Sequence, residues 1–254
     1  MSHPQTIEIS GVCYFASDFH FGAPDKKTSS KREQLVIRWL DQIQKDANHL
    51  FLLGDIFDFW FEYNDKPPTF YSLFLNKIAE LRKNGIEIYF FTGNHDMWVK
   101  NYLKNSLGIH VFKKIQEFVI NDKKFLIGHG DGLGKGEYGY KCLKTFLNCK
   151  INIWLFGLIP QKIGIALAHL LSKKSRAMTP GYKENFLGNE KEILIQYCLQ
   201  YLVYYDIDYF IFGHRHLPLE IAIDNAIYFN TGDWINYNTY IKYEKNPFLC
   251  SFDQ

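Results

Sequence analysis

Histidine, aspartate and asparagine side chains follow five short apolar runs of this chain, each near the point where a strand would end. The runs read VCYFASDFH, HLFLLGD, EIYFFTGNHD, KFLIGHGD and YFIFGHRH. Such polar groups are costly to hold beside a core unless something binds them. Because ligands of α/β sheets bind at the carboxyl ends of strands, we expect these side chains to gather in one cluster. Its candidate members are Asp18, His20, Asp55, Asp58, Asn94, His95, His129, His214 and His216.

The residue types in this cluster indicate a site for transition-metal ions. Imidazole and carboxylate together favour Mn, Fe, Zn or Co over Ca. In an extended segment the D-x-H spacing of Asp18 and His20 puts both side chains on one face, as does the H-x-H spacing of His214 and His216. Any one pattern alone is more often a turn, but all five in this order favour a metal site. The other histidines are expected at the surface, in turns or on a helix face: His3, His49, His110 and His169.

The segments between the runs have the period of amphipathic helices. Apolar residues recur three or four positions apart in two segments, at Leu35, Trp39, Leu40 and Ile43 and at Phe70, Leu73, Phe74, Ile78 and Leu81. Strands that alternate with helices predict a layered α/β fold. Near the C-terminus LEIAI, AIYFN, TYIKY and FLCSF follow one another with little helix between them. They predict an antiparallel or mixed extension of the sheet.

The composition excludes several classes of protein. With 254 residues, of which 47% are hydrophobic, the chain can bury a large core and is not a disordered segment. The formal net charge of +2 provides no global basic field for nucleic acid. The five cysteines form no C-x-x-C pair and are interpreted as unpaired thiols of a reducing compartment. The N-terminus lacks the basic and apolar regions of a secretory signal, so a cytoplasmic protein is expected.

Residues 137–185 break the alternation of strand and helix. They are predicted to form two or three helices, an inserted cap within a single domain of residues 1–254. Part of this range, residues 151–171, is about as long as a membrane span. Lys162 falls in its middle, however, and a lysine at mid-bilayer costs roughly 2.5–3.5 kcal/mol. The segment therefore predicts a pair of apolar helices rather than a span.

The five motifs in this order resemble those of the calcineurin-like metallophosphoesterases. The resemblance runs from residue 13 to residue 235 and rests on SDFHFG, GDIFDFW, GNHD, GHGD and GHRH. It implies a four-layer αββα sandwich with two divalent metal ions at the strand ends, expected to be Mn²⁺, with Fe or Zn as alternatives. By position in the motifs, the first metal would be held by Asp18, His20 and His216, the second by Asn94, His129 and His214, and both by Asp55 as a bridge.

The same resemblance implies a mechanism. Two cations roughly 3.5–4 Å apart would activate a bridging water and orient phosphate oxygens for in-line attack. His95 would donate to the phosphoryl oxygens or to the leaving group, and Asp58 would fix the tautomer of its ring.

Among these phosphoesterases the chain is most similar to the UDP-2,3-diacylglucosamine diphosphatases of lipid A biosynthesis. In GHGDGLGKGEYGYK, Glu137 and Tyr140 stand at the places of that family's acidic residue and tyrosine. The stretch WLFGLIPQKIGIALAHLLSKKSRA resembles the helical cap that covers acyl chains in the family. Two positions differ from the best-known members, which carry Arg in place of His95 and Asp in place of Glu137. These differences place the chain in a divergent branch.

This second resemblance implies cleavage of the pyrophosphate of UDP-2,3-diacylglucosamine to UMP and 2,3-diacylglucosamine 1-phosphate. The enzyme would make peripheral contact with the cytoplasmic face of the inner membrane. An apolar helix pair alone is more often ordinary core, and a basic run alone is more often a solvated helix end. Together they suit an amphipathic substrate at a membrane surface. The substrate-binding set would be Glu137 and Tyr140, the apolar residues Trp154, Leu155, Leu158, Ile163 and Leu167, and the basic residues Lys173, Lys174 and Arg176.

Three other interpretations stay open. A phosphoesterase for another phosphodiester, a nucleotide or a nucleic acid would keep the metals but would favour a basic groove, which the charge of +2 does not indicate. A non-enzymatic scaffold of the same fold would have lost metal ligands, whereas all seven are present. An integral membrane protein would need residues 151–171 to span, which Lys162 disfavours. The sequence predicts no oligomeric state.

Overall fold

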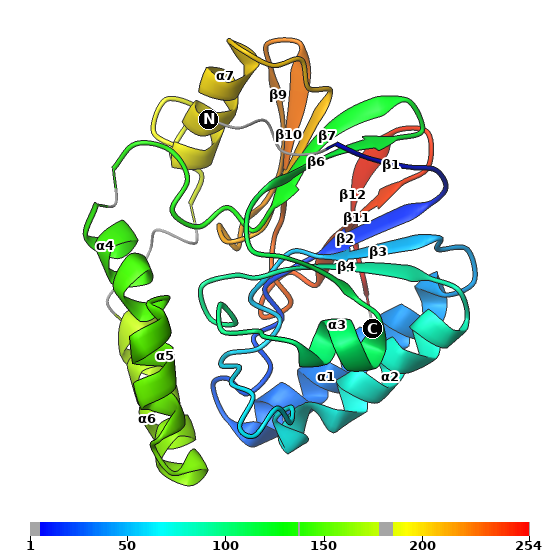
Figure 1. The fold of residues 1–254 in the computed structure, drawn as a ribbon. Coiled ribbons are helices and arrows are strands. Elements are labelled where there is room, and N and C mark those ends of the chain that lie inside the picture. The colour runs from blue at the N-terminus through cyan, green and yellow to red at the C-terminus, as the bar shows by residue number, and fades with distance from the viewer. Residues whose placement is uncertain (1–5, 137, 178–184, 254) are drawn as a thin grey trace.

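The computed structural model describes residues 6–136, 138–177 and 185–253 and contains two six-stranded sheets packed face to face (Figure 1). Sheet A consists, in spatial order, of β1 (Ile7–Ile9), β6 (Gln116–Ile120), β7 (Lys123–Gly128), β8 (Tyr209–Phe212), β10 (Ala226–Thr231) and β9 (Pro218–Ile223). Its central strands β7, β8 and β10 are parallel, whereas β6 and β9 run antiparallel to their neighbours β7 and β10.

Sheet B consists, in spatial order, of β12 (Pro247–Ser251), β11 (Thr239–Tyr243), β2 (Cys13–Ala16), β3 (His49–Leu52), β4 (Glu87–Phe91) and β5 (His110–Phe112). The strands β2 to β5 are parallel, and β11 pairs antiparallel with both β2 and β12. All five apolar runs that precede the motifs are therefore strands, as predicted. Three of them lie in sheet B and two, β7 and β8, in sheet A.

Side chains of the central strands alternate between two cores. In β2, Cys13 and Phe15 pack between the two sheets, while Tyr14 and Ala16 pack against the helices of the outer face. Successive side chains of a strand point to opposite faces, so a strand covered on both sides needs apolar residues at every position. That requirement explains why the runs are continuously apolar.

Helices cover the outer face of each sheet. Helices α1 (Lys26–Ile43), α2 (Ser72–Lys83) and α3 (Tyr102–Leu107), with the short 3₁₀ turn η1 (Thr69–Tyr71), lie over sheet B. Helix α7 (Ile193–Leu202) lies over sheet A, where Leu194, Ile195 and Cys198 are buried against Phe210 and Phe212. The layers run helix, sheet, sheet, helix, which confirms the predicted αββα sandwich (Figure 1).

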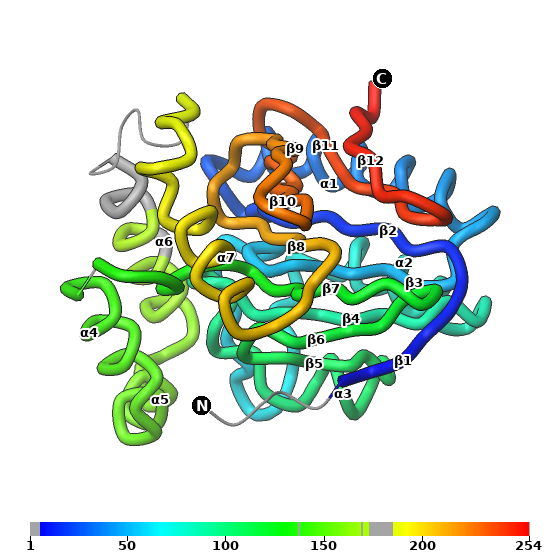
Figure 2. Tube along the Cα trace, turned by 90° about the horizontal axis from the view of Figure 1, so that it is seen from above, coloured from blue at the N-terminus to red at the C-terminus, as the bar shows by residue number. Residues whose placement is uncertain are grey.

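Three further helices form a column beside the sandwich: α4 (Tyr138–Leu147), α5 (Lys150–Gly157) and α6 (Gln161–Ala177) (Figures 1 and 2). They fall within the range 137–185 assigned to a cap; the division of the chain into one domain with this insertion stays a prediction. No helix in residues 6–136, 138–177 or 185–253 is long and apolar enough to cross a bilayer.

The four C-terminal strands form antiparallel pairs as predicted, but they extend two sheets: β9 and β10 join sheet A, and β11 and β12 join sheet B. Two expectations about local structure were wrong. Phe70, in η1, and Leu73, in the first turn of α2, are 42% and 49% exposed, and α2 buries Phe74, Ile78 and Leu81 instead. His49 is buried in β3, where its Nε2 lies 2.9 Å from the Ser10 carbonyl oxygen.

Candidate metal centre

The polar motif residues lie on the loops that leave the carboxyl ends of β2, β3, β4, β7 and β8. Parallel strands bring these loops to one edge of each sheet, and the two edges meet. The backbone N–H of His214, after β8, donates to Asp18 Oδ2, after β2, at 2.9 Å. The Gly213 N–H donates to the His129 carbonyl at 3.0 Å. Residues of both sheets therefore share one site.

The backbone at this site adopts conformations that side chains other than glycine rarely take. Asp18, His20, Asp55, His214 and His216 all have φ between 45° and 67°. Left-handed backbone at such residues costs on the order of 1–3 kcal/mol each and persists where the surroundings enforce it. Five of the seven candidate metal ligands are held in this way, so the loops are shaped to aim these side chains.

Two glycines of the motifs permit a close approach of neighbouring loops. A Cβ on Gly93 would collide with the Asp55 carboxylate, and a Cβ on Gly213 would collide with the side chains of Ser17 and Asp18. The glycine that opens GNHD and the one that opens GHRH therefore leave room for carboxylates of other strands.

One group of possible metal ligands consists of Asp18, His20, Asp55 and His216, whose ligand atoms all lie within 4.8 Å of one another. His216 Nε2 is 3.0 Å from Asp18 Oδ1 and 3.2 Å from His20 Nε2. His20 Nε2 is 3.8 Å from Asp55 Oδ2. All four residues are buried.

A second group consists of Asp55, His129 and His214, again with ligand atoms within 4.8 Å. His129 Nε2 lies 3.5 Å from Asp55 Oδ2 and 3.3 Å from Asn94 Oδ1. Asp55 is thus the residue that the two groups share, and Asn94 borders the second. The structure brings together all seven residues for which the motifs imply metal ligation.

The chemistry of these donors fits divalent cations. His20 Nδ1 is buried and has no hydrogen-bond partner among the described residues. Burial lowers the pKa of His20 to about 4, so its ring is neutral and offers one nitrogen lone pair. A buried neutral imidazole grouped with carboxylates is a ligand set that suits a divalent transition-metal ion.

Electrostatics keep the two central carboxylates ionised. Burial alone would raise the pKa of Asp18, but the His216 and His20 side chains outweigh it and hold that pKa well below the usual range. Asp55 behaves in the same way: burial opposes ionisation, and His129 and His95 lower its pKa well below the usual range. Both groups are therefore anionic ligands at neutral pH.

Neighbouring acceptors orient two of the imidazoles. His129 Nδ1 donates to the Leu53 carbonyl at 2.7 Å, and His216 Nδ1 lies 3.0 Å from Asp233 Oδ2. Hydrogen bonds at Nδ1 leave Nε2 as the ligand atom. Sequence reasoning missed Asp233. The signal was the GD that follows β10, but a turn of this type is common and by itself indicates nothing.

His95 and Asp58 lie beside the first group. The backbone N–H of His95 donates to Asp55 Oδ1 at 2.8 Å. The His95 ring is perpendicular to the His20 ring, and the two ring centroids are 4.8 Å apart. His95 Nδ1 is 3.4 Å from Asp58 Oδ1 and 3.1 Å from the Asp58 carbonyl oxygen. The side chains of His20, Asp58 and His95 also approach one another closely enough to hold an ion.

Asp96, the last residue of GNHD, braces the loops and was not assigned a role from the sequence. Its carboxylate accepts from the Gly93 N–H at 2.6 Å and from the Ile56 N–H at 2.9 Å. Burial, followed by the neighbouring Asp55 charge, raises the pKa of Asp96 to about 7. Asp96 thus connects the loop after β4 to the loop after β3.

The structure places the predicted substrate-binding residues in different surroundings, and some of their side chains lie outside its described part. Tyr140 on α4 donates to Asp131 Oδ2, and Lys144 Nζ is 2.6 Å from the same oxygen. Glu137 lies outside the described residues, as do the side chains of Lys173, Lys174 and Arg176, whose backbone belongs to α6. The apolar residues assigned to the cap wall are all exposed: Trp154 and Leu158 at 63%, Ile163 at 59%, Leu155 at 50% and Leu167 at 39%.

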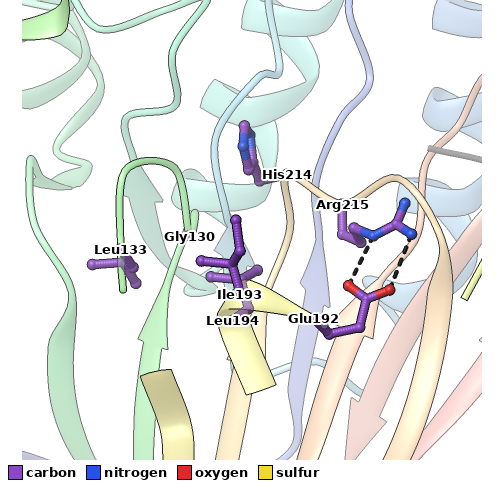
Figure 3. A pocket seen from close by; sticks show the side chains of 7 residues that line it. All are labelled: Gly130, Leu133, Glu192, Ile193, Leu194, His214 and Arg215. Atoms are coloured by element: carbon purple, nitrogen blue, oxygen red, sulfur yellow. Dashed lines mark hydrogen bonds and ion pairs between the residues drawn. The ribbon is translucent and has the colours of Figure 1, made fainter. Parts of the chain in front are cut away.

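A buried ion pair supports the loop that carries His214 and His216. Figure 3 shows the Arg215 guanidinium beside Glu192, at the start of α7. Arg215 Nε donates to Glu192 Oε2 at 3.0 Å, and Nη2 donates to Oε1 at 3.1 Å. This bidentate pair ties the loop after β8 to the segment that returns from the cap.

Comparison with known proteins agrees with this geometry. Residues 13–218 match the family described as calcineurin-like phosphoesterase. A Porphyromonas gingivalis protein named UDP-2,3-diacylglucosamine hydrolase is 34% identical over 242 residues, which are 89% of this chain and 92% of that protein. Proteins of the same name from Histophilus somni (strain 129Pt) and Haemophilus influenzae (strain PittGG) are 26% and 24% identical; the matches cover 80% and 92% of this chain and 83% and 95% of those proteins. The chain therefore belongs to the calcineurin-like phosphoesterase family.

Proposed function

We propose that this enzyme hydrolyses the pyrophosphate of UDP-2,3-diacylglucosamine to UMP and 2,3-diacylglucosamine 1-phosphate. The observation that carries the proposal is the pair of buried ligand groups that share Asp55. Such a pair suits a two-metal phosphoester or phosphoanhydride hydrolase. The substrate comes from the relatives, since proteins that match most of the chain are named for it.

In this proposal Asp18, His20 and His216 hold one divalent ion, and Asn94, His129 and His214 hold the other. Asp55, with two carboxylate oxygens, contributes to both. Imidazole and carboxylate ligands suit Mn²⁺, which we take as the metal, with Fe or Zn as alternatives. When bound, the two ions lower the pKa of a water and neutralise charge on the phosphate oxygens.

His95 acts on the phosphate or on the leaving group. The backbone N–H of His95 donates to Asp55 Oδ1 at 2.8 Å, which fixes the loop beside the metal ligands. Asp58 engages Nδ1 through its carboxylate and its carbonyl, so Nε2 is the nitrogen that donates to the departing or bridging oxygen.

The cap provides the acyl-chain site. Trp154, Leu155, Leu158, Ile163 and Leu167 expose apolar surface that a small polar substrate does not require. Each buried methylene contributes about 0.8 kcal/mol, so two acyl chains can dominate recognition. Glu137, Tyr140, Lys173, Lys174 and Arg176 complete the substrate-binding set. Such a substrate is taken from the cytoplasmic face of the inner membrane, where the enzyme makes peripheral contact.

The experiment is product analysis with the purified enzyme and Mn²⁺. UDP-2,3-diacylglucosamine should yield UMP and 2,3-diacylglucosamine 1-phosphate in equal amounts, measured by mass spectrometry. Release of UDP would contradict the proposed bond. If the enzyme hydrolyses bis(p-nitrophenyl) phosphate but does not cleave UDP-2,3-diacylglucosamine, the proposed substrate is wrong, while the proposed metal centre still stands.

A further inference from the structure

A hydroxyl group of the cap reaches the catalytic loops. Ser172 on α6 donates to Asp58 Oδ1 at 2.8 Å, and the same Oγ lies 3.2 Å from His95 Nδ1. These partners are 114 and 77 positions away in sequence. The contact therefore joins the inserted cap to the loops after β3 and β4.

The burial of Ser172 is unusual for its helix. Within residues 161–168 and 170–172 of α6, only Gly164 and Ser172 are buried. The two residues before Ser172, Leu170 and Leu171, are 64% and 57% exposed. A buried serine directly after two exposed leucines means that this turn of α6 faces the catalytic loops with a polar group, where an apolar contact would serve simple packing better.

The hydrogen bonds around His95 fit an arrangement in which Ser172 and Asp58 together hold Nδ1. The Ser172 hydroxyl donates to the Asp58 carboxylate, which accepts only. The His95 Nδ1–H then has the Asp58 carbonyl oxygen at 3.1 Å and the Ser172 oxygen at 3.2 Å as acceptors. With Nδ1 held by these acceptors, Nε2 is the nitrogen that faces the reaction.

We propose that Ser172 is a positioning residue through which the cap holds Asp58 and His95 in their working arrangement. The inference rests on the proposed role of His95 and deepens it. Ser172 acts through Asp58 and His95, so a cap that seats α6 against the sandwich also aligns the catalytic ring. Acyl-chain binding and catalysis are thereby coupled through one hydroxyl.

The test compares Ser172→Ala with Ser172→Thr and with the control variant Thr145→Ala. The Thr145 hydroxyl is also in the cap and donates within its own helix, to the Lys141 carbonyl at 2.8 Å. Loss of a group that orients another residue at a metal site typically costs 10–100-fold. We expect Ser172→Ala to lower kcat about 10-fold on both the lipid substrate and bis(p-nitrophenyl) phosphate, with KM and metal content unchanged. Ser172→Thr should restore most of the rate, and Thr145→Ala should match the wild type.

A double-mutant cycle separates positioning from other roles. If Ser172 acts through His95, adding Ser172→Ala to His95→Ala should change kcat less than about twofold, because coupled residues are not additive. An equal loss in both backgrounds, or a loss confined to KM of the lipid, would overturn this inference alone. Full turnover of His95→Ala would overturn the proposed role of His95 and the inference with it.

Discussion

The metal centre is made mostly of buried polar side chains, whereas the cap exposes apolar ones. The metal centre lies where two sheets meet, and most of its residues are buried and held by left-handed backbone or by hydrogen bonds to neighbouring loops. The cap is a column of helices that exposes apolar side chains such as Trp154 and Leu158. In the function proposed above, the sandwich carries the chemistry and the exposed apolar surface of the cap chooses the substrate. Changes at the metal centre should therefore lower kcat for every substrate, whereas changes at the exposed apolar residues of the cap should raise KM for the lipid alone.

The two regions meet through aromatic side chains of the catalytic motifs. Phe156 of α5 packs against Trp98, Phe61 and Phe59, with ring centroids 4.8, 5.1 and 5.7 Å apart. Trp98 follows GNHD, and Phe59 and Phe61 belong to or adjoin GDIFDFW. These two motifs thus provide polar residues for the metal centre and are followed by aromatic residues that contact the cap.

The largest effect is expected for Asp55→Asn. The variant keeps the shape of the side chain but removes the charge shared by the two ligand groups, so metal content should fall. Turnover should drop roughly 10⁴-fold, the loss of about 5 kcal/mol of transition-state stabilisation. Elemental analysis and steady-state kinetics measure both, and the melting temperature of the metal-free proteins provides the control for folding. Two bound metals with full activity would refute the bridging role.

His95→Ala should reduce kcat roughly 10²–10³-fold while metal content stays near that of the wild type. The ring is a proposed donor to the reacting phosphate rather than a ligand, and loss of one such donor typically has this effect. Kinetics on bis(p-nitrophenyl) phosphate and elemental analysis of the same sample provide the measurement. Loss of metal would make His95 part of the centre itself.

Leu158→Asp should leave the metal centre untouched and weaken only the lipid site. Burying one leucine is worth about 1.5–3 kcal/mol, so KM for the acylated substrate should rise about 10-fold or more. Turnover of a soluble phosphodiester should not change. The matched control is Leu73→Asp on α2, another exposed leucine at 49% accessibility. If both variants behaved alike towards the lipid, the cap would have no special role.

The smallest effect is expected for Tyr140→Phe. This change removes the hydroxyl that bonds Asp131 and keeps the ring, so α4 loses one of its two contacts to that carboxylate. A hydrogen bond to a charged group contributes roughly 1.5–3 kcal/mol, but Lys144 still pairs with the same oxygen, so we expect a net loss of about 1 kcal/mol, or about a fivefold fall in kcat/KM for the lipid. Unchanged hydrolysis of bis(p-nitrophenyl) phosphate would accompany it. A fall for both substrates would assign Asp131 and Tyr140 to the metal centre instead.

Much of the fold and the membership of the site could be predicted because both rest on local patterns. Apolar runs that end in polar residues predicted β2, β3, β4, β7 and β8, and the order of the motifs predicted which residues gather. The left-handed backbone at Asp18 or His214 could not be predicted, because contacts between loops of different sheets enforce it. Asp233 and Ser172 were missed for the same reason: each meets its histidine only after the chain has folded.

The burial of His49 is a further feature that the sequence pattern could not predict. Nothing in the residues around it distinguishes a buried ring from an exposed one, since the acceptor at Ser10 lies 39 positions earlier in the chain. In the predicted helix around residues 70–81, Phe70 and Leu73 were counted with the apolar face, but both are exposed. The spacing of apolar residues does not by itself tell which of them the sheet covers.

The central claim is that the sandwich provides the chemistry and the cap selects a diacylated substrate. The most direct test is kcat/KM of the wild-type enzyme for UDP-2,3-diacylglucosamine and for its deacylated analogue, under the same metal conditions. We predict a preference of at least about 100-fold for the acylated compound, because burial of even a few methylenes of each chain provides that much free energy. Equal values for the two would contradict the claim.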